Sequence, residues 1–122
     1  VLDNNGKNRD LYAQNHPSLK GRMIFTNSTP GTPESAILFM NEPIENEAKI
    51  KELVKQGYIV RTRADADTME ARSEDYSRFE KAKNSGAQII TTDYYYPSKL
   101  FKSTYKISFD NDTYERKNPI IK

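Results

Sequence analysis

Two arginines lie two residues apart at the end of an apolar, β-branched run, in the segment 57–68 with the sequence GYIVRTRADADT. A guanidinium group presents a planar fork of hydrogen-bond donors that fits phosphate oxygens, so Arg61 and Arg63 are candidates for binding an anionic ligand. The alternative is an internal ion pair, with Asp93 as the candidate partner of Arg63. Either interpretation requires an anionic partner, because burying an unpaired charge is very costly.

A second polar cluster, Asp93-Tyr94-Tyr95, follows the apolar run at residues 87–92. Tyrosine rings at the mouth of a site can stack on a ligand ring, or they can pack as half-buried groups with a wet hydroxyl. Both interpretations stay open for Tyr94. The candidate ligand-binding residues are therefore Arg61, Arg63, Asp93, Tyr94 and Tyr95.

The acidic residues that follow the arginines do not form an EF-hand calcium loop. Counted from Asp65, such a loop needs glycine at its sixth position and glutamate at its twelfth, where this sequence has Glu70 and Tyr76. Aspartate and threonine ahead of a helix are ordinary capping residues. We interpret the segment as a capping loop with hydrogen bonds around Arg61, Arg63 and Arg72, and we predict no metal ligands in this chain.

Short apolar or alternating runs predict the strands that position these side chains. The runs lie at residues 1–3 (the tail of a strand), 23–26, 36–40, 58–62, 87–92 and 105–109. Apolar residues at helical spacing predict two helices, one at residues 45–56 and one that begins after Thr68 or Ser73 and ends at Gly86. Residues 11–20 predict a polar connection with one helical turn at most.

Strands that alternate with helices are typical of parallel βαβ units, which occur in doubly wound sheets and in (β/α)8 barrels. A period of two places Ile59, Arg61 and Arg63 on one face of their strand. Helices cover both faces of a doubly wound sheet, so both should be apolar. The inner face of a barrel instead opens on a site at the carboxyl ends of its strands. The cationic face favours an α/β barrel with helices on the outside.

Composition bounds the function classes. The 122 residues fit one domain, of which 35% are hydrophobic and 30% charged. The net charge of +2, without a basic block, gives no indication of nucleic-acid binding. The absence of cysteine excludes disulfides and thiol nucleophiles, and no apolar run reaches the roughly 20 residues of a transmembrane helix.

Several segments together resemble the bacterial calcium-dependent phosphoinositide phospholipase C family, and more broadly the TIM-barrel phosphodiesterases of the phospholipase C type. The segments are HPSLKGRMIF, LFMNEP, GYIVRTRADADTMEAR, SGAQIITTDYYYP and ERKNP, and they run from about residue 16 to residue 119. GYIVRTRADADT and SGAQIITTDY are the most specific of them. One departure is that the family's closing alanine-arginine-cysteine-asparagine-proline run reads ERKNP here.

The resemblance implies a hydrolase that cleaves the phosphodiester of a phosphoinositide or a related small phosphodiester, with two histidines as acid and base and with calcium on the phosphate. This chain has one histidine, His16, so it cannot supply that pair. A (β/α)8 barrel takes about 250 residues, so residues 1–122 are expected to be its C-terminal half and inactive alone. Calcium would be bound mainly by the missing N-terminal half, and the protein would be secreted or periplasmic.

Two further expectations follow from the half-barrel interpretation. Exposed strand edges favour aggregation, so we expect the missing half or a second copy of the chain to cover them. A non-catalytic binding module derived from the same barrel is the alternative function, and residues upstream of Val1 would discriminate between the two. A nucleotide-binding fold is disfavoured, because no glycine-rich phosphate loop follows a strand.

Overall fold

The computed structural model of the chain describes residues 6–121. Three strands, β1 (Ile37–Phe39), β2 (Ile59–Arg63) and β3 (Ile89–Thr91), form a parallel sheet in the order β1-β2-β3. Helix α2 (Pro43–Lys55) connects β1 to β2, and α3 (Met69–Ser73) and α4 (Ser77–Ser85) connect β2 to β3. The α/β class and the parallel βαβ pattern predicted from the sequence are therefore confirmed.

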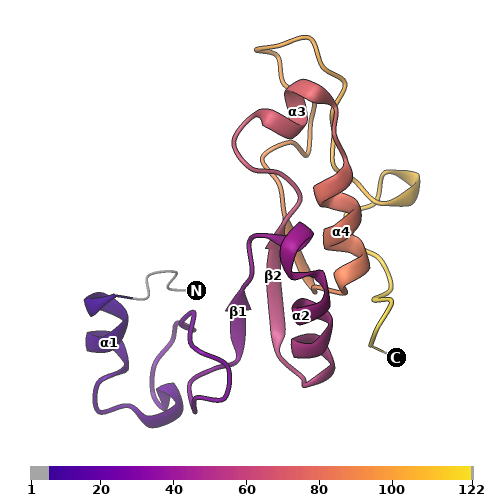
Figure 1. Cartoon of the computed structure of the whole chain (residues 1–122). Helices are drawn as coiled ribbons and strands as arrows, with labels where there is room; N and C mark the ends of the chain where they lie inside the picture. The colour runs from indigo at the N-terminus through magenta and orange to yellow at the C-terminus, as the bar shows by residue number, and fades with distance from the viewer. Residues whose placement is uncertain (1–5, 122) are drawn as a thin grey trace.

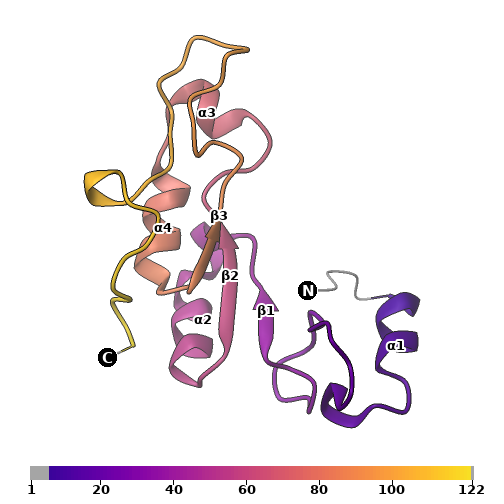
Figure 2. The same ribbon diagram turned by 180° about the vertical axis from the view of Figure 1, so that it is seen from behind.

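Helices α2 and α4 cover one face of the sheet, and no helix within the described residues covers the other face (Figures 1 and 2). The covered face holds the first core cluster, in which Ile50 of α2 and Val60 of β2 are completely buried. Leu38, Leu53, Val54 and Ala87 complete this cluster. The period of two in the strands explains why these positions, and not their neighbours, contact the helices.

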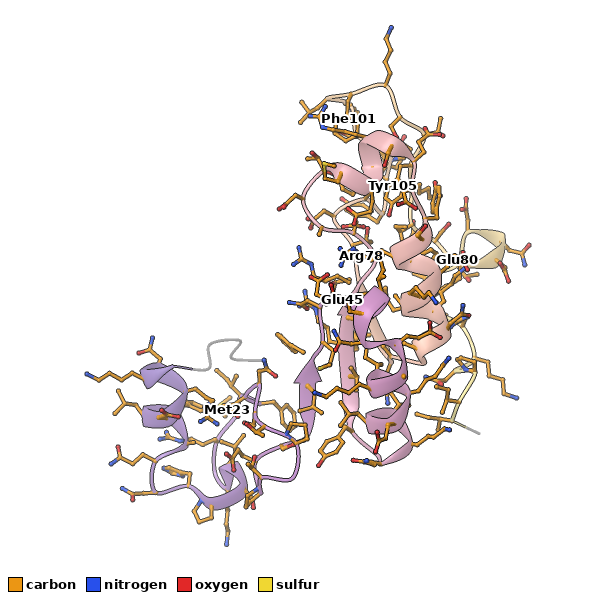
Figure 3. All side chains as sticks on the ribbon, viewed as in Figure 1. Met23, Glu45, Arg78, Glu80, Phe101 and Tyr105 are labelled. Carbon is orange, nitrogen blue, oxygen red and sulfur yellow. The ribbon has the colours of Figure 1, made fainter. Side chains whose placement is uncertain are left out.

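A second core cluster lies beyond the carboxyl end of the sheet, where the segment after β3 packs against α3 and α4. Its centre is Tyr105, which is 1% exposed (Figure 3). The Tyr105 ring stacks on Tyr76 at a centroid distance of 4.7 Å and meets Tyr94 edge-on at 5.6 Å. Buried Phe79 of α4 and Ile107 extend the cluster. Aromatic packing therefore fixes the long segment that follows β3.

The strand predicted at residues 23–26 is wrong. Met23 is 97% exposed and Phe25 is 51% exposed, although Thr26 is buried, and the isolated bridge to Ile37 comes from the next residue, Asn27. Residues 7–35, which include α1 (Lys7–Ala13) and the short 3-10 helix η1 (Pro17–Leu19), form an arm beside β1 (Figure 1). An apolar run becomes a buried strand only where a neighbour covers it, and the described residues give this run none.

The predicted strand at residues 105–109 is also absent, although its alternation correctly identified the buried side. Tyr105 and Ile107 are buried, but the segment makes only one ladder-like bond, from the Ile107 N–H to the Tyr94 carbonyl at 2.8 Å. The turn predicted after it is the 3-10 helix η2 (Asp110–Asp112). The alternation of apolar and polar residues indicates which side of an extended segment is buried. A strand forms only if a neighbouring strand also pairs with the segment.

Helix boundaries differ from the predictions in three places. Helix α1 overlaps the polar connection predicted at 11–20 only at residues 11–13, and α2 begins at Pro43, a favoured first helical residue. The single helix predicted up to Gly86 is two helices, because Glu74 adopts a left-handed conformation (φ 54°) that ends α3. The predicted strand tail at 1–3 lies outside the described residues.

Candidate functional site

The two arginines of β2 lie on the sheet face that no helix covers. Val60 and Thr62, which alternate with them, are completely buried on the helix side, whereas Ile59 is 41% exposed. Arg61 is in register with Phe39 of β1 and with Ile89 of β3. The face parity predicted from the sequence therefore agrees with the structure, and the guanidinium groups belong to the open face.

The Arg61 side chain is held by two neighbours, Phe39 of β1 and Asn41, which lies two residues beyond that strand. Its Nη1 donates a hydrogen bond to the side-chain oxygen of Asn41 at 2.8 Å. Its guanidinium carbon lies 5.0 Å from the centre of the Phe39 ring, in a cation–π contact. Neither neighbour carries a charge, so Arg61 is positioned while its positive charge has no ion-pair partner among residues 6–121.

Arg63 has a different environment. It is half-buried at the carboxyl end of β2, and among residues 6–121 it has neither a hydrogen-bond nor an ion-pair partner. The ion pair with Asp93, the alternative considered from the sequence, does not form within this part of the chain. A half-buried guanidinium without a counter-charge is suited to an anionic ligand.

The three predicted residues after β3 occupy different environments. Asp93 is exposed, and its N–H donates to a carboxylate oxygen of Asp65 at 3.0 Å. Tyr95 is 65% exposed. Tyr94 is 9% exposed, packs within the second core cluster and donates its hydroxyl to the Asp67 carbonyl at 3.0 Å. The structure thus gives the Tyr94 ring a packing role and separates it from the open face.

Asp65 connects the loops that follow β2 and β3. It is 2% exposed, and its two carboxylate oxygens accept hydrogen bonds from the Thr92 hydroxyl and from the Asp93 N–H. Burial raises the pKa of the Asp65 carboxyl, and these two hydrogen bonds oppose the rise without cancelling it. Of the hydrogen bonds predicted around the arginines, the described residues show the one from Arg72 to the Thr68 hydroxyl and none from this loop to Arg61 or Arg63. Asp65 instead binds the residues just after β3, and Glu70 accepts from the Ala66 N–H.

The raised pKa of Asp65 predicts a pH-dependent difference between the natural protein and D65N. The folded state keeps the Asp65 proton to higher pH than the unfolded state does, so its contribution to stability falls as pH rises from the ordinary aspartate pKa to the raised one. The D65N side chain cannot ionise, so D65N should not lose this stability. The free energy of unfolding of D65N minus that of the natural protein should therefore increase as pH rises across this window. Urea unfolding from just below the ordinary aspartate pKa to neutrality measures the difference.

Thr92→Val provides the opposite change for this experiment. It removes the hydroxyl that donates to the carboxylate, so the pKa of Asp65 should rise further and stability should fall more steeply with pH. Identical pH profiles for the natural protein, D65N and T92V would contradict this assignment.

An ion-pair network centred on Arg78 fixes the loops that follow β1 and β2, on the helix side of Arg61 and Arg63. Arg78 of α4 donates to Glu70 at 2.7 Å and to Glu42 at 2.6 Å, and its Nη1 lies 3.3 Å from the Asn41 carbonyl oxygen (Figure 3). Desolvation acts to lower the pKa of Arg78, but the hydrogen bonds that it donates to the Glu42 and Glu70 carboxylates raise it overall. Arg78 and Arg61 therefore both bind Asn41, one through its backbone and one through its side chain.

A cavity of about 320 Å³ borders the open face at Phe39. Its walls include Arg9 of α1, Lys49 of α2 and the polar residues Asn27 and Ser28. Arg9 already contacts Asp10 at 2.6 Å and Glu34 at 3.5 Å. The cavity lies beside the stacked Phe39 and Arg61 side chains. The positive charge of Arg9 in its wall is largely compensated by these two carboxylates.

The described residues do not provide a metal site or a histidine pair. No group of three or more histidine, aspartate or glutamate side chains within residues 6–121 is arranged to hold a metal ion. His16 is half-buried directly before η1, where its Nδ1 is 2.9 Å from the Lys20 carbonyl oxygen. In residues 6–121 we also find no helix that is long and apolar enough to cross a membrane.

A family model for calcium-dependent phosphoinositide phospholipase C matches residues 1–119 of the chain. The chain belongs to this family. Neither the curated proteins nor the solved structures gave a significant match. Membership of the phosphoinositide phospholipase C family gives the open-face arginines a chemical context, since the substrates that name this family contain phosphate. Calcium belongs to the same description, and no group of three or more candidate metal ligands is found among residues 6–121.

Sequence reasoning missed two contributors to the site, Asn41 and Phe39. Both belong to the segment LFMNEP, whose sequence indicates only the end of a strand and contributes to the family resemblance. Phe39 sits opposite Arg61 in the parallel register, so strand alignment would have paired them. Asn41 and Arg78 had no signal of this kind, because 37 residues separate them along the chain.

Proposed function

We propose that this chain forms the phosphate-binding wall of a phosphodiester hydrolase acting on phosphoinositides or related phosphodiesters. The observation that carries the proposal is Arg63, a half-buried cation on the open face with no counter-charge among the described residues. Membership of the phosphoinositide phospholipase C family supports phosphate as the missing partner. Arg61 adds a second guanidinium on the same face.

The chemical contribution of these groups would be electrostatic. When an inositol hydroxyl or water attacks phosphorus, negative charge grows on the phosphate oxygens that do not leave. A guanidinium held at that position stabilises the charge through bidentate, charge-assisted hydrogen bonds. Arg63 would make this contact, and Arg61 would orient the same phosphate from the neighbouring position. Asp93 and Tyr95, both exposed after β3, would contact the polar part of the substrate.

The parallel sheet with helices on one face supports a partial (β/α)8 barrel, whose inner face would be the open face. Ile59 and Ile89 on that face are 41% and 43% exposed, and burying them is expected to require further strands. The acid–base pair would then come from the other half of the barrel. We therefore expect no phosphodiesterase activity from residues 1–122 alone.

Replacing Arg63 by glutamine tests the function directly. Glutamine keeps a polar side chain but loses the charge and the planar fork, so affinity for inositol 1-phosphate should fall about tenfold. Isothermal titration of the chain at low ionic strength measures this, with R22Q as the matched control. Arg22 is exposed and stacks on Tyr12 in the N-terminal arm, so R22Q should bind as the natural chain does.

Equal affinities for R63Q and R22Q would refute the phosphate-binding wall. Binding that is retained without hydrolysis, even when the upstream residues are present, would instead favour the non-catalytic binding module. One observation favours this second function, the non-catalytic binding module. His16 is the single histidine of the chain, and its ring contacts a backbone carbonyl rather than a carboxylate.

A further inference from the structure

The structure assigns Asn41 as a positioning residue that orients Arg61 while leaving its positive charge available to a phosphate; this inference rests on the proposed function. Arg61 has no carboxylate within ion-pair distance in the described part of the chain, and within that part the single hydrogen-bond partner of its side chain is the Asn41 amide oxygen at 2.8 Å. An aspartate would fit the same space but would neutralise the guanidinium.

The position of Asn41 is itself fixed from the helix side. Its backbone carbonyl accepts from Arg78, which also binds Glu42 next to it. The neighbouring Met40 lies within the sheet hydrogen bonding, since its N–H donates to the Arg61 carbonyl at 2.9 Å and its carbonyl accepts from the Thr62 hydroxyl at 2.7 Å. The loop after β1 therefore has little freedom, and the Asn41 amide oxygen is a preorganised acceptor.

The rest of the Asn41 side chain has no structural task among the described residues. Its amide nitrogen donates no hydrogen bond within residues 6–121. Replacing the NH2 group by oxygen therefore deprives no neighbouring group in this part of the chain of a hydrogen-bond partner. The cation–π contact with Phe39 orients Arg61 from a second side, again without a negative charge. Two neutral partners on one cation are the combination expected where the charge is kept for a ligand.

N41D separates a positioning role from a structural one. It preserves the shape and the acceptor, so the folded state should be as stable as that of the natural protein, or slightly more stable through the new ion pair. Affinity for inositol 1-phosphate should nevertheless fall about fivefold, because the carboxylate competes with the phosphate for Arg61. N41A, which removes the acceptor without adding charge, should lose less affinity than N41D.

Asn84→Asp is the matched control, because Asn84 is exposed on α4 and makes no side-chain hydrogen bond among the described residues. It adds the same charge to the helix side of the sheet and should leave affinity unchanged. The decisive measurement is the double mutant with R61Q. If Asn41 acts through Arg61, N41D should have no further effect on affinity in the R61Q background.

The outcomes distinguish this inference from the proposed function. If R61Q and R63Q both leave inositol 1-phosphate binding unchanged, the proposed function fails. If they weaken binding while N41D does not, or if N41D weakens binding equally in the R61Q background, the role of Asn41 is overturned and the phosphate-binding wall stands. Loss of affinity in N41D together with a lower melting temperature would also overturn it, since that result indicates a structural role.

Discussion

Replacing Tyr105 by alanine is expected to lower the free energy of unfolding by about 3–5 kcal/mol, the usual range for truncating a buried aromatic residue. Tyr105 is 1% exposed, contacts Tyr76 and Tyr94 ring to ring, and anchors the segment after β3 to α3 and α4. A small domain has only about 5–15 kcal/mol of stability in total, so the loss would be a large fraction of it. Urea unfolding followed by circular dichroism measures the change.

Tyr105→Phe is the control for this truncation. The hydroxyl of Tyr105 donates one long hydrogen bond of 3.4 Å to the Ala64 carbonyl, so its removal should cost at most about 1 kcal/mol. Tyr105→Leu should fall between the two variants, because leucine fills part of the space. A loss below about 1 kcal/mol in Y105A would contradict the assignment of Tyr105 as the centre of the second core cluster.

Replacing Arg78 by methionine is expected to lower the free energy of unfolding by about 2–3 kcal/mol at neutral pH. The Glu70 side chain is largely buried, and R78M leaves its negative charge without the cation that it contacts. Burial acts to raise the pKa of Glu70, but the hydrogen bonds from the Ala66 N–H and Arg78 lower it overall. A lowered carboxyl pKa contributes stability that is present above the ordinary glutamate value and is lost as pH falls through the folded value. The difference between R78M and the natural protein should therefore shrink in acid.

Two controls accompany R78M in the same urea-unfolding series. Lys81→Met removes the exposed pair with Glu47 and should cost no more than about 1 kcal/mol. E70Q should recover part of the stability lost in R78M, because it removes the carboxylate that R78M leaves unpaired. A difference between R78M and the natural protein that stays constant down to acid pH would show that Arg78 stabilises the fold by packing and not by charge.

The helix and strand order and the facing of the side chains were determined by local patterns in the sequence. The alternation at residues 58–63 placed Arg61 and Arg63 on one face, and the helical spacing at residues 45–56 placed Ile50 against the sheet. Both patterns depend only on the period of the backbone, so they need no knowledge of distant residues. The resemblance to the family also came from short segments, of which GYIVRTRADADT was the most specific, and the family model that matches residues 1–119 confirms it.

Only the tertiary structure decided which predicted strands pair and what each charged group contacts. The runs at 23–26 and 105–109 have strand patterns, yet pairing depends on a neighbour that the pattern does not name. The contacts of Asn41 with Arg61 and Arg78 span 20 and 37 residues of sequence, so no local spacing encodes them. Tyr94 was ambiguous in sequence for the same reason, because burial of a tyrosine ring is decided by the segment that folds over it.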